Sequence, residues 1–139
     1  MAKRILIVGG VTGGASAAAR LRRLDESAEI VIFERGPHVS YSNCSLPYFL
    51  SRVVPDSGSL LIVTPERFKK QYNIEVRTEH EVTSIDRAAK TIHVKHGGKE
   101  SEERYDVLIL SPGAEPIRPK SIEGVQRENV FTVRSVKDV

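Results

Sequence analysis

The stretch RILIVGGVTGGASAAARLRRL, residues 4–24, decides the fold. It opens with a short, mainly apolar run from Arg4 to Val8, which is typical of a strand buried on both faces of a parallel sheet. Glycines follow at once, and residues 13–24 are then dominated by strong helix formers and contain no proline. The stretch therefore predicts a strand, a tight glycine turn and a helix, in that order.

Two further segments extend this pattern into a sheet. Residues 29–33 read EIVIF, end at Glu34 and predict a second buried strand. A strand, a helix and a strand within about thirty residues form a βαβ unit. Residues 105–110 (YDVLIL) predict another buried strand, which Ser111-Pro112-Gly113 stops abruptly. We expect an α/β fold of Rossmann type, with helices around a central parallel sheet.

The middle of the chain predicts two short helices and a connection. The first helix is expected at residues 45–52 and the second at residues 64–72, with Thr64 as N-cap and Pro65 at the first helical position. Residues 114–124 are rich in proline, so we expect an extended connection there.

Short strand-like runs follow the second helix. Residues 74–77 predict a third strand of the main sheet, and residues 81–86 and 91–95 predict a small antiparallel meander. The turn at residues 96–98 closes the last of these runs. Residues 130–133 (VFTV) predict one last strand, and we expect no capping element after it.

Composition excludes several classes of protein. The 139 residues and 40% hydrophobic content suit one core. The net charge of +3 comes from basic residues mixed with acidic ones, which argues against a nucleic-acid partner. One cysteine excludes an intrachain disulfide, and no apolar run approaches the roughly 20 residues of a membrane span. We expect a protein of the reducing cytoplasm without a membrane partner.

The glycine turn GGVTGG lies where a dinucleotide fingerprint belongs, between a strand and a helix. Gly9 and Gly14 hold the first and third glycine positions, whereas Val11 takes the middle one. Backbone N–H groups and the helix N-terminus would stabilise a pyrophosphate. Glu34, twenty residues after Gly14, is placed to accept hydrogen bonds from both ribose hydroxyls. Together they predict an adenine dinucleotide, FAD or NAD, against the alternative of a cofactor-free turn and a solvated glutamate.

Cys44 is the single cysteine and directly precedes a predicted helix in SYSNCSLPY, residues 40–48. A helix N-terminus favours the thiolate and lowers the pKa of a thiol. Ser40, Ser42 and Asn43 add hydrogen-bonding groups nearby. The alternative is that Cys44 is a small buried hydrophobe, and spacing alone does not decide between these two interpretations.

Two further pairs of residues are candidates for binding a ligand or a metal ion. Arg20 and Arg23 lie three apart on one face of the predicted helix, where they either bind substrate phosphates or form a solvated surface. His93 and His96 are offset by three within a predicted strand and so point to opposite faces. We therefore expect no metal site at these histidines.

Assembled in order, these segments resemble the N-terminal part of the FAD-dependent pyridine nucleotide-disulfide oxidoreductases. The resemblance is to the single-cysteine branch, which contains coenzyme A disulfide reductases, NADH-dependent persulfide reductases and NADH oxidases. The matching pieces are ILIVGGVTGGASAAARLRRLD, VIFERG, SYSNCSLPY, TPERF, HEV, YDVLILSPGAEP and FTVR. The resemblance implies that residues 1–139 are the N-terminal part of an FAD/NAD(P)-binding domain. It also implies that the NAD(P)H domain and the C-terminal dimerisation domain are absent, so that this chain is incomplete and lacks turnover alone.

The resemblance implies roles for individual residues. Cys44 would be the redox nucleophile. FAD would contact Gly9, Val11, Thr12, Gly13, Glu34, Arg35, Asn43, Val82, Ser111, Pro112, Gly113 and Arg134. A coenzyme A substrate would approach along Ser16, Arg20, Arg23, Ser40 and Asn43, with the arginines on its phosphates.

The resemblance also suggests a reaction, in which NAD(P)H supplies electrons and a small disulfide or persulfide receives them in a homodimeric enzyme. Peroxidases and several NADH oxidases of this branch carry a histidine where this chain has Thr12. Thr12 therefore favours reduction of coenzyme A disulfide or persulfide. The alternatives are an NADH oxidase of the same family and a non-catalytic nucleotide-binding module. Tyr41 and Ser45 depart from the commoner phenylalanine and glycine, and the Ser45 side chain is expected to alter access to the sulfur.

Overall fold

The computed structural model describes residues 2–139, which divide into two compact units. The first unit comprises the chain up to Tyr41 together with Val63–Pro112, and the second comprises Ser42–Ile62 and Gly113–Val139. No helix among residues 2–139 has both the length and the apolar character needed to cross a bilayer.

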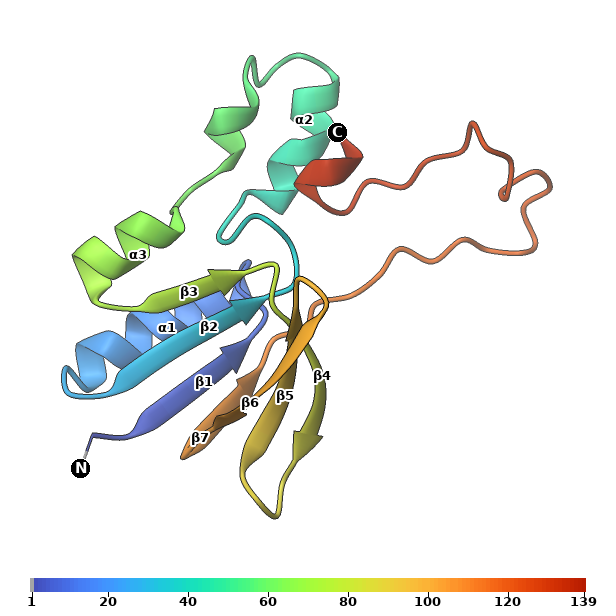
Figure 1. Cartoon of the computed structure of the whole chain (residues 1–139). Helices are drawn as coiled ribbons and strands as arrows, with labels where there is room; N and C mark the ends of the chain where they lie inside the picture. Colours follow the sequence, from blue (N-terminus) through green and yellow to red (C-terminus); the bar gives the residue numbers. More distant parts are fainter. Residues whose placement is uncertain (1) are drawn as a thin grey trace. The chain divides into compact units, whose positions relative to one another are not determined.

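A four-stranded parallel sheet forms the centre of the first unit (Figure 1). Its strands, in the order β3-β2-β1-β7, are β3 (Glu75–Thr78), β2 (Glu29–Glu34), β1 (Arg4–Val8) and β7 (Val107–Leu110). All neighbouring pairs are parallel, which confirms the predicted sheet. The carboxyl ends of the strands therefore meet at one edge, where the glycine turn follows β1.

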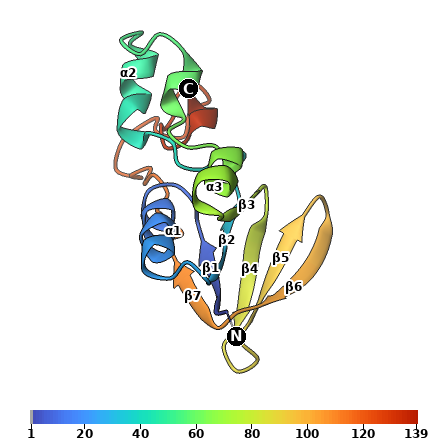
Figure 2. The ribbon, with the colours of Figure 1, turned by 90° about the vertical axis from the view of Figure 1, so that its left-hand side faces the viewer.

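Alternating side chains of the sheet bury two separate cores. The core on one face joins the sheet to α1 (Gly13–Leu24) and α3 (Pro65–Tyr72), and it includes Ile5, Ile7, Ala18, Ile30, Ile32 and Phe68. The core on the other face includes Leu6, Val31, Phe33, Ile92 and Val94. Because successive strand residues point to opposite faces, the helices cover one face and the meander covers the other (Figure 2).

The meander has three strands, β4 (Glu81–Asp86), β5 (Thr91–His96) and β6 (Lys99–Arg104). Residues 96–98 end β5 as expected, but a third meander strand, β6, follows them and was not predicted. Gly97 and Gly98 both have positive φ, at 55° and 78°, so they turn the chain back into β6, as a two-residue hairpin loop requires. The sequence KESEER of β6 has no apolar alternation, so pattern alone did not reveal this strand.

Charged side chains dock β6 against the main sheet. Glu103 of β6 accepts hydrogen bonds from Arg4 of β1 at 2.7 Å and from Arg77 of β3 at 2.5 Å. Burial disfavours the charged form of Glu103, but the two guanidinium groups outweigh it, so the pKa of this carboxyl lies below its ordinary value. An ion-pair network therefore supports this strand where apolar packing is sparse.

The second unit contains short helical segments: η1 (Asn43–Ser45), α2 (Leu46–Leu50), η2 (Ser57–Leu60) and η3 (Val136–Asp138). The helix predicted at residues 45–52 is thus confirmed in a shorter form. The extended connection at residues 114–124 is present up to Pro119, and turns follow it.

Two expectations for the C-terminal segment are wrong. Residues 130–133 form no strand, and Phe131 is 80% exposed. A strand needs a neighbour for its backbone hydrogen bonds, and the described residues of the second unit contain no strand. A capping element does follow, because Asp138 accepts hydrogen bonds from Ser135 N at 2.6 Å and Ser135 Oγ at 3.0 Å. The bond from Ser135 N, together with a bond from the backbone of Asp138 to the Ser135 side chain, forms a capping box at the start of η3.

The helices of the first unit begin and end as the sequence predicts. Thr64 Oγ1 accepts a hydrogen bond from Arg67 N at 3.4 Å, and Pro65 opens α3. Asn73 ends α3 in the left-handed conformation at φ 48°. β7 begins at Val107 rather than Tyr105 and lies at the edge of the sheet, so it is less buried than expected.

Arg22 joins the C-terminal ends of α1 and α3. Its guanidinium donates to Tyr72 O at 2.8 Å, Asn73 O at 2.9 Å, Glu26 O at 2.7 Å and Asp25 O at 3.2 Å. Arg22 is only 9% exposed, whereas its neighbour Arg23 is exposed. These carbonyl groups lie at or just beyond the C-terminal ends of α1 and α3, where backbone acceptors have no partner within a helix, and Arg22 donates to them.

We predict that Arg22→Lys lowers the free energy of unfolding by about 1–3 kcal/mol, because an ammonium group cannot reach all four carbonyls and leaves partly buried acceptors unpaired. Chemical denaturation of the intact protein would measure this loss. The matched control is Arg23→Lys, on the same helix but exposed, which should change stability by no more than about 0.5 kcal/mol. Equal losses in the two variants would contradict the role of Arg22.

Candidate functional site

The glycine turn after β1 brings three backbone segments into close contact. Gly9 has φ 90°, and its N–H donates to Phe33 O at 2.8 Å. A Cβ at Gly9 would lie 2.0 Å from Ser111 O, and a Cβ at Gly14 would lie 1.8 Å from Gly9 O. No side chain fits at either position, so both glycines are required for α1 to start directly against the ends of β1 and β7.

The first turn of α1 faces outward beside this turn. Thr12 and Gly13 are exposed, and the first turn contains no acidic residue. The N–H groups at a helix start have no acceptors within the helix, and the helix dipole is positive there. A Cβ at Gly13 would lie 3.2 Å from Ser111 Oγ, so this side of the turn is also narrow. The arrangement fits an anionic group such as a pyrophosphate.

Glu34 clasps the glycine turn from the end of β2. Its carboxylate accepts hydrogen bonds from Gly10 N and Gly36 N, each at 2.8 Å, and the residue is 8% exposed. The sequence predicts a ribose as the partner of this carboxylate but gives no sign of its bonds to Gly10, which is 24 residues away, or to Gly36. Each carboxylate oxygen can accept another hydrogen bond, so these two contacts do not use up the acceptors that ribose hydroxyls would need.

Other residues expected at the cofactor occupy separate places in the first unit. Val11 is half-buried after Gly10, and Arg35 is exposed directly after Glu34. Ser111 N donates to Val8 O at 2.7 Å, which ties it to the glycine turn, and Pro112 follows it. Val82 packs against the core on the sheet face that the meander covers, and it lies beside a register shift in β4. A cofactor role for these residues stays a prediction.

The residues expected to meet the substrate divide into two groups. Ser16, Arg20 and Arg23 are exposed on α1, and their spacing of four and three places them on one helix face. Ser40 is only 9% exposed and adopts φ 49°. Its N–H donates to Gly10 O at 2.9 Å and its carbonyl accepts from Val63 N, so its backbone supports the glycine turn. The role expected for Ser40 along the substrate approach stays a prediction.

Cys44 lies in η1 of the second unit and is exposed, which excludes the alternative of a buried hydrophobe. Ser42 Oγ lies 3.3 Å from Cys44 Sγ and 2.7 Å from Ser45 Oγ. Hydrogen bonds from the hydroxyls of Ser42 and then Ser45 lower the pKa of the Cys44 thiol. The expected low pKa is thus present, with these hydroxyls as its largest causes, and α2 begins two residues after Cys44, at Leu46.

Three further residues that the resemblance assigns to the cofactor lie close together in the second unit: Asn43, Gly113 and Arg134. Arg134 Nε donates to Ala114 O at 2.8 Å, and a Cβ at Gly113 would lie 3.1 Å from Arg134 Nη2. Asn43, the residue before the cysteine, donates from Nδ2 to Arg134 O at 3.5 Å. Gly113 has φ 74°, which glycine adopts without strain. These contacts bring segments 43–45 and 113–114 of the second unit to the same arginine.

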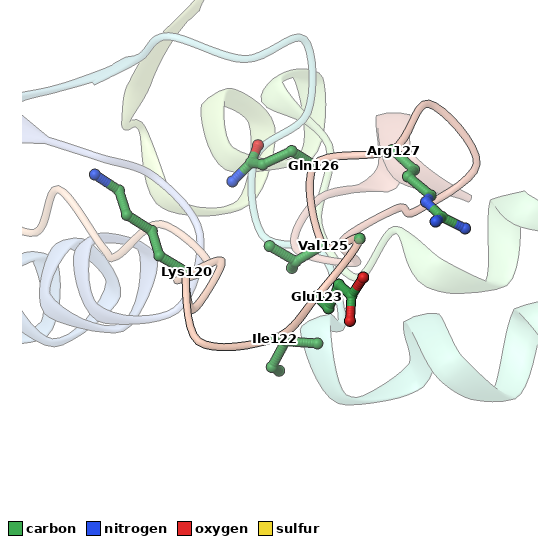
Figure 3. Close-up of a pocket in the computed structure, with 7 residues that line it drawn as sticks. Lys120, Ile122, Glu123, Val125, Gln126 and Arg127 are labelled. Carbon is green, nitrogen blue, oxygen red and sulfur yellow. The ribbon is translucent and has the colours of Figure 1, made fainter.

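A pocket of about 430 Å³ lies between Lys120 and Arg127 (Figure 3). One loop supplies all of its lining, and none of the residues expected to bind cofactor or substrate belongs to it. Among residues 2–139, no group of three or more His, Cys, Asp or Glu side chains is arranged to hold a metal ion.

The fold and these groups define an α/β protein with a dinucleotide-type glycine turn and an exposed thiol of lowered pKa. Residues 3–139 match the family described as pyridine nucleotide-disulphide oxidoreductase, so the chain belongs to that family. The coenzyme A disulfide reductase of Staphylococcus haemolyticus is 39% identical over 138 residues, which are 98% of this chain and 30% of that protein. The chain therefore spans under a third of the length of this curated relative.

Two solved structures are similar over nearly the whole chain. Reduced CoADR-RHD of Bacillus anthracis is 47% identical, with a TM-score of 0.93, and the match covers 99% of this chain and 25% of that one. The NAD-dependent persulfide reductase of A. fulgidus is 37% identical, with a TM-score of 0.91, over 97% of this chain and 26% of that one. The predicted Rossmann-type fold and family are thus confirmed.

We predict that Ser42→Ala moves the pKa of Cys44 upward, because the thiolate loses the hydroxyl that stabilises it most. Only the thiolate reacts with iodoacetamide. A plot of the alkylation rate against pH should therefore have its midpoint at higher pH in the variant than in the wild type. Ser51→Ala is the matched control, since Ser51 Oγ donates to Tyr48 O instead. Coincident pH profiles for wild type and Ser42→Ala would contradict the prediction.

Proposed function

We propose that this chain is the FAD-binding and thiol-bearing part of an NAD(P)H-dependent disulfide reductase, which acts on coenzyme A disulfide or persulfide through Cys44. The observation that carries the proposal is the exposed Cys44 thiol, whose pKa is lowered by two serine hydroxyls, in a chain of this family. The thiolate is the reactive form in thiol-disulfide exchange, and a lowered pKa increases its fraction near neutral pH.

The glycine turn supplies a suitable place for FAD. Gly9 and Gly14 pack closely while Thr12 and Gly13 stay exposed, and the acid-free first turn of α1 suits a pyrophosphate. Glu34 would hold the adenosine ribose, and the further contacts would come from Val11, Thr12, Gly13, Arg35, Asn43, Val82, Ser111, Pro112, Gly113 and Arg134. Bound there, FAD would supply an acceptor for the hydride of NAD(P)H and a source of two electrons for sulfur.

Cys44 performs the sulfur chemistry. Its thiolate attacks one sulfur of the substrate disulfide, the S–S bond of the substrate breaks, and the leaving thiolate takes a proton from solvent. Cys44 is then part of a mixed disulfide. Reductive cleavage of that bond consumes two electrons and one proton, releases the second thiol and regenerates the Cys44 thiolate, which Ser42 stabilises by donating a hydrogen bond.

The exposed face of α1 suits a substrate that carries phosphates. Ser16, Arg20 and Arg23 share this face, and a coenzyme A nucleotide presents phosphates that guanidinium groups bind well. By the family resemblance, Asn43 also lies on the approach, and Thr12 favours this reductase over an NADH oxidase. The same resemblance adds a homodimer, and the free thiol suits a reducing cytoplasm.

We expect Cys44→Ser to abolish reduction of coenzyme A disulfide and coenzyme A persulfide while FAD stays bound. The wild-type flavoprotein should show a long-wavelength charge-transfer absorption that disappears in the variant, because the alcohol does not ionise to replace the thiolate. Assays of the intact enzyme with coenzyme A disulfide, coenzyme A persulfide and oxygen side by side would identify the substrate. Persistence of the band, or consumption of oxygen alone, would overturn the proposal.

We also expect Arg23→Ala to raise KM for a coenzyme A substrate by about three- to tenfold, since one charge-assisted hydrogen bond to phosphate is lost. A disulfide without phosphates should be reduced at an unchanged rate. Lys70→Ala, at an exposed position of α3, serves as the control for loss of surface charge. Similar effects of Arg23→Ala on both substrates would remove this arginine from phosphate binding.

A further inference from the structure

Two histidines of the first unit form a stacked pair. The rings of His80 and His96 have centroids 3.9 Å apart and planes inclined by 6°. His80 lies in the turn between β3 and β4, and His96 is the last residue of β5. Neither takes part in the chemistry proposed for this chain. In sequence His96 pairs with His93 as a candidate, whereas in the fold its ring stacks on that of His80.

Each ring of this pair holds a backbone carbonyl. His80 Nδ1 lies 2.7 Å from Thr78 O, and His96 Nδ1 lies 2.9 Å from Glu79 O. A carbonyl oxygen only accepts hydrogen bonds, so Nδ1 is the donor in both contacts. The nearly parallel planes do not direct the two Nε2 lone pairs at one point, which argues against a shared metal ion.

The carbonyl that His96 holds belongs to a strained turn. Glu79 has φ 59°, a left-handed conformation that residues other than glycine adopt at a cost in free energy. Such a conformation persists only where its surroundings hold it in place. Glu79 N donates to Gly36 O, and His80 N donates to Glu34 O, both at 3.0 Å. His96 supplies the third fixed point, from the meander.

This turn connects directly to the glycine turn. Gly36 N and Gly10 N donate to the two oxygens of the Glu34 carboxylate, each at 2.8 Å. A continuous path of hydrogen bonds and short backbone links therefore runs from His96 through Glu79, Gly36 and Glu34 to Gly10. It ends at the groups that fit the ribose and pyrophosphate of an adenine dinucleotide.

We propose that His96, stacked on His80, is a positioning residue for the adenosine-pyrophosphate end of the dinucleotide site. It holds the strained turn at Glu79, and that turn in turn orders Gly36 and the Glu34 carboxylate. The proposal rests on FAD binding as proposed above. It makes the meander, which contributes no residue to the glycine turn, a determinant of cofactor affinity.

The test measures dissociation constants of the intact protein, stripped of flavin, for FAD and for ADP. In His96→Ala both constants should rise by the same factor, about three- to tenfold, because ADP contains the half of FAD that this end of the site holds. His96→Asn, which retains a donor near the Nδ1 position, should restore most of the affinity. The matched control is His93→Ala, at an exposed position of the same strand.

The outcomes separate this proposal from the proposed function. If the wild type binds FAD and ADP but His96→Ala binds both as tightly, the positioning role is overturned and the cofactor assignment stands. A weakened FAD affinity with unchanged ADP affinity also overturns it, because the effect then lies outside the adenosine end. If the wild type binds neither ligand, both proposals fail. Equal weakening for FAD and ADP, with rescue by asparagine and none of it in His93→Ala, supports it.

Discussion

Close approach of main chain to main chain at Gly9 and Gly14 is the constraint on which the first unit depends. A single Cβ at Gly14 would come within 1.8 Å of Gly9 O, so α1 could not start where it does. With both glycines in place, β1, α1 and β7 meet without intervening side chains, and the carboxylate of Glu34 ties the turn to the end of β2. The start of α1, whose N–H groups fit a pyrophosphate, is therefore placed by tight backbone packing as well as by hydrogen bonds.

Much of this arrangement follows from local sequence. Continuous apolar runs at β1 and β2 predict strands covered on both faces, and Thr64-Pro65 predicts the start of α3, because these signals act over a few residues. The position of Glu34 is predictable for the same reason. Its hydrogen bonds to Gly10 and Gly36 are not predictable, since they depend on how the turns after β1 and β2 approach each other in the fold.

The features that sequence did not reveal depend on contacts distant in the chain or on geometry finer than an element. β6 is held by pairing to β5 and by Arg4 and Arg77, so a run of charged residues became a strand. The low pKa of Cys44 was expected from a helix start, whereas its largest causes are hydrogen bonds from the hydroxyls of Ser42 and Ser45. Arg22 and Arg23 look alike in sequence, and only the fold separates the buried one from the exposed one.

The charged character of β6 has a consequence for self-association. β6 is an edge strand of the meander, and an edge presents unpaired backbone groups to which a strand of another molecule could add. Its sequence places a lysine, an arginine and three glutamates on six residues, and most of them are exposed. An approaching strand would have to desolvate these charges. The charged residues that make β6 hard to predict as a strand therefore also protect the meander against aggregation through this edge.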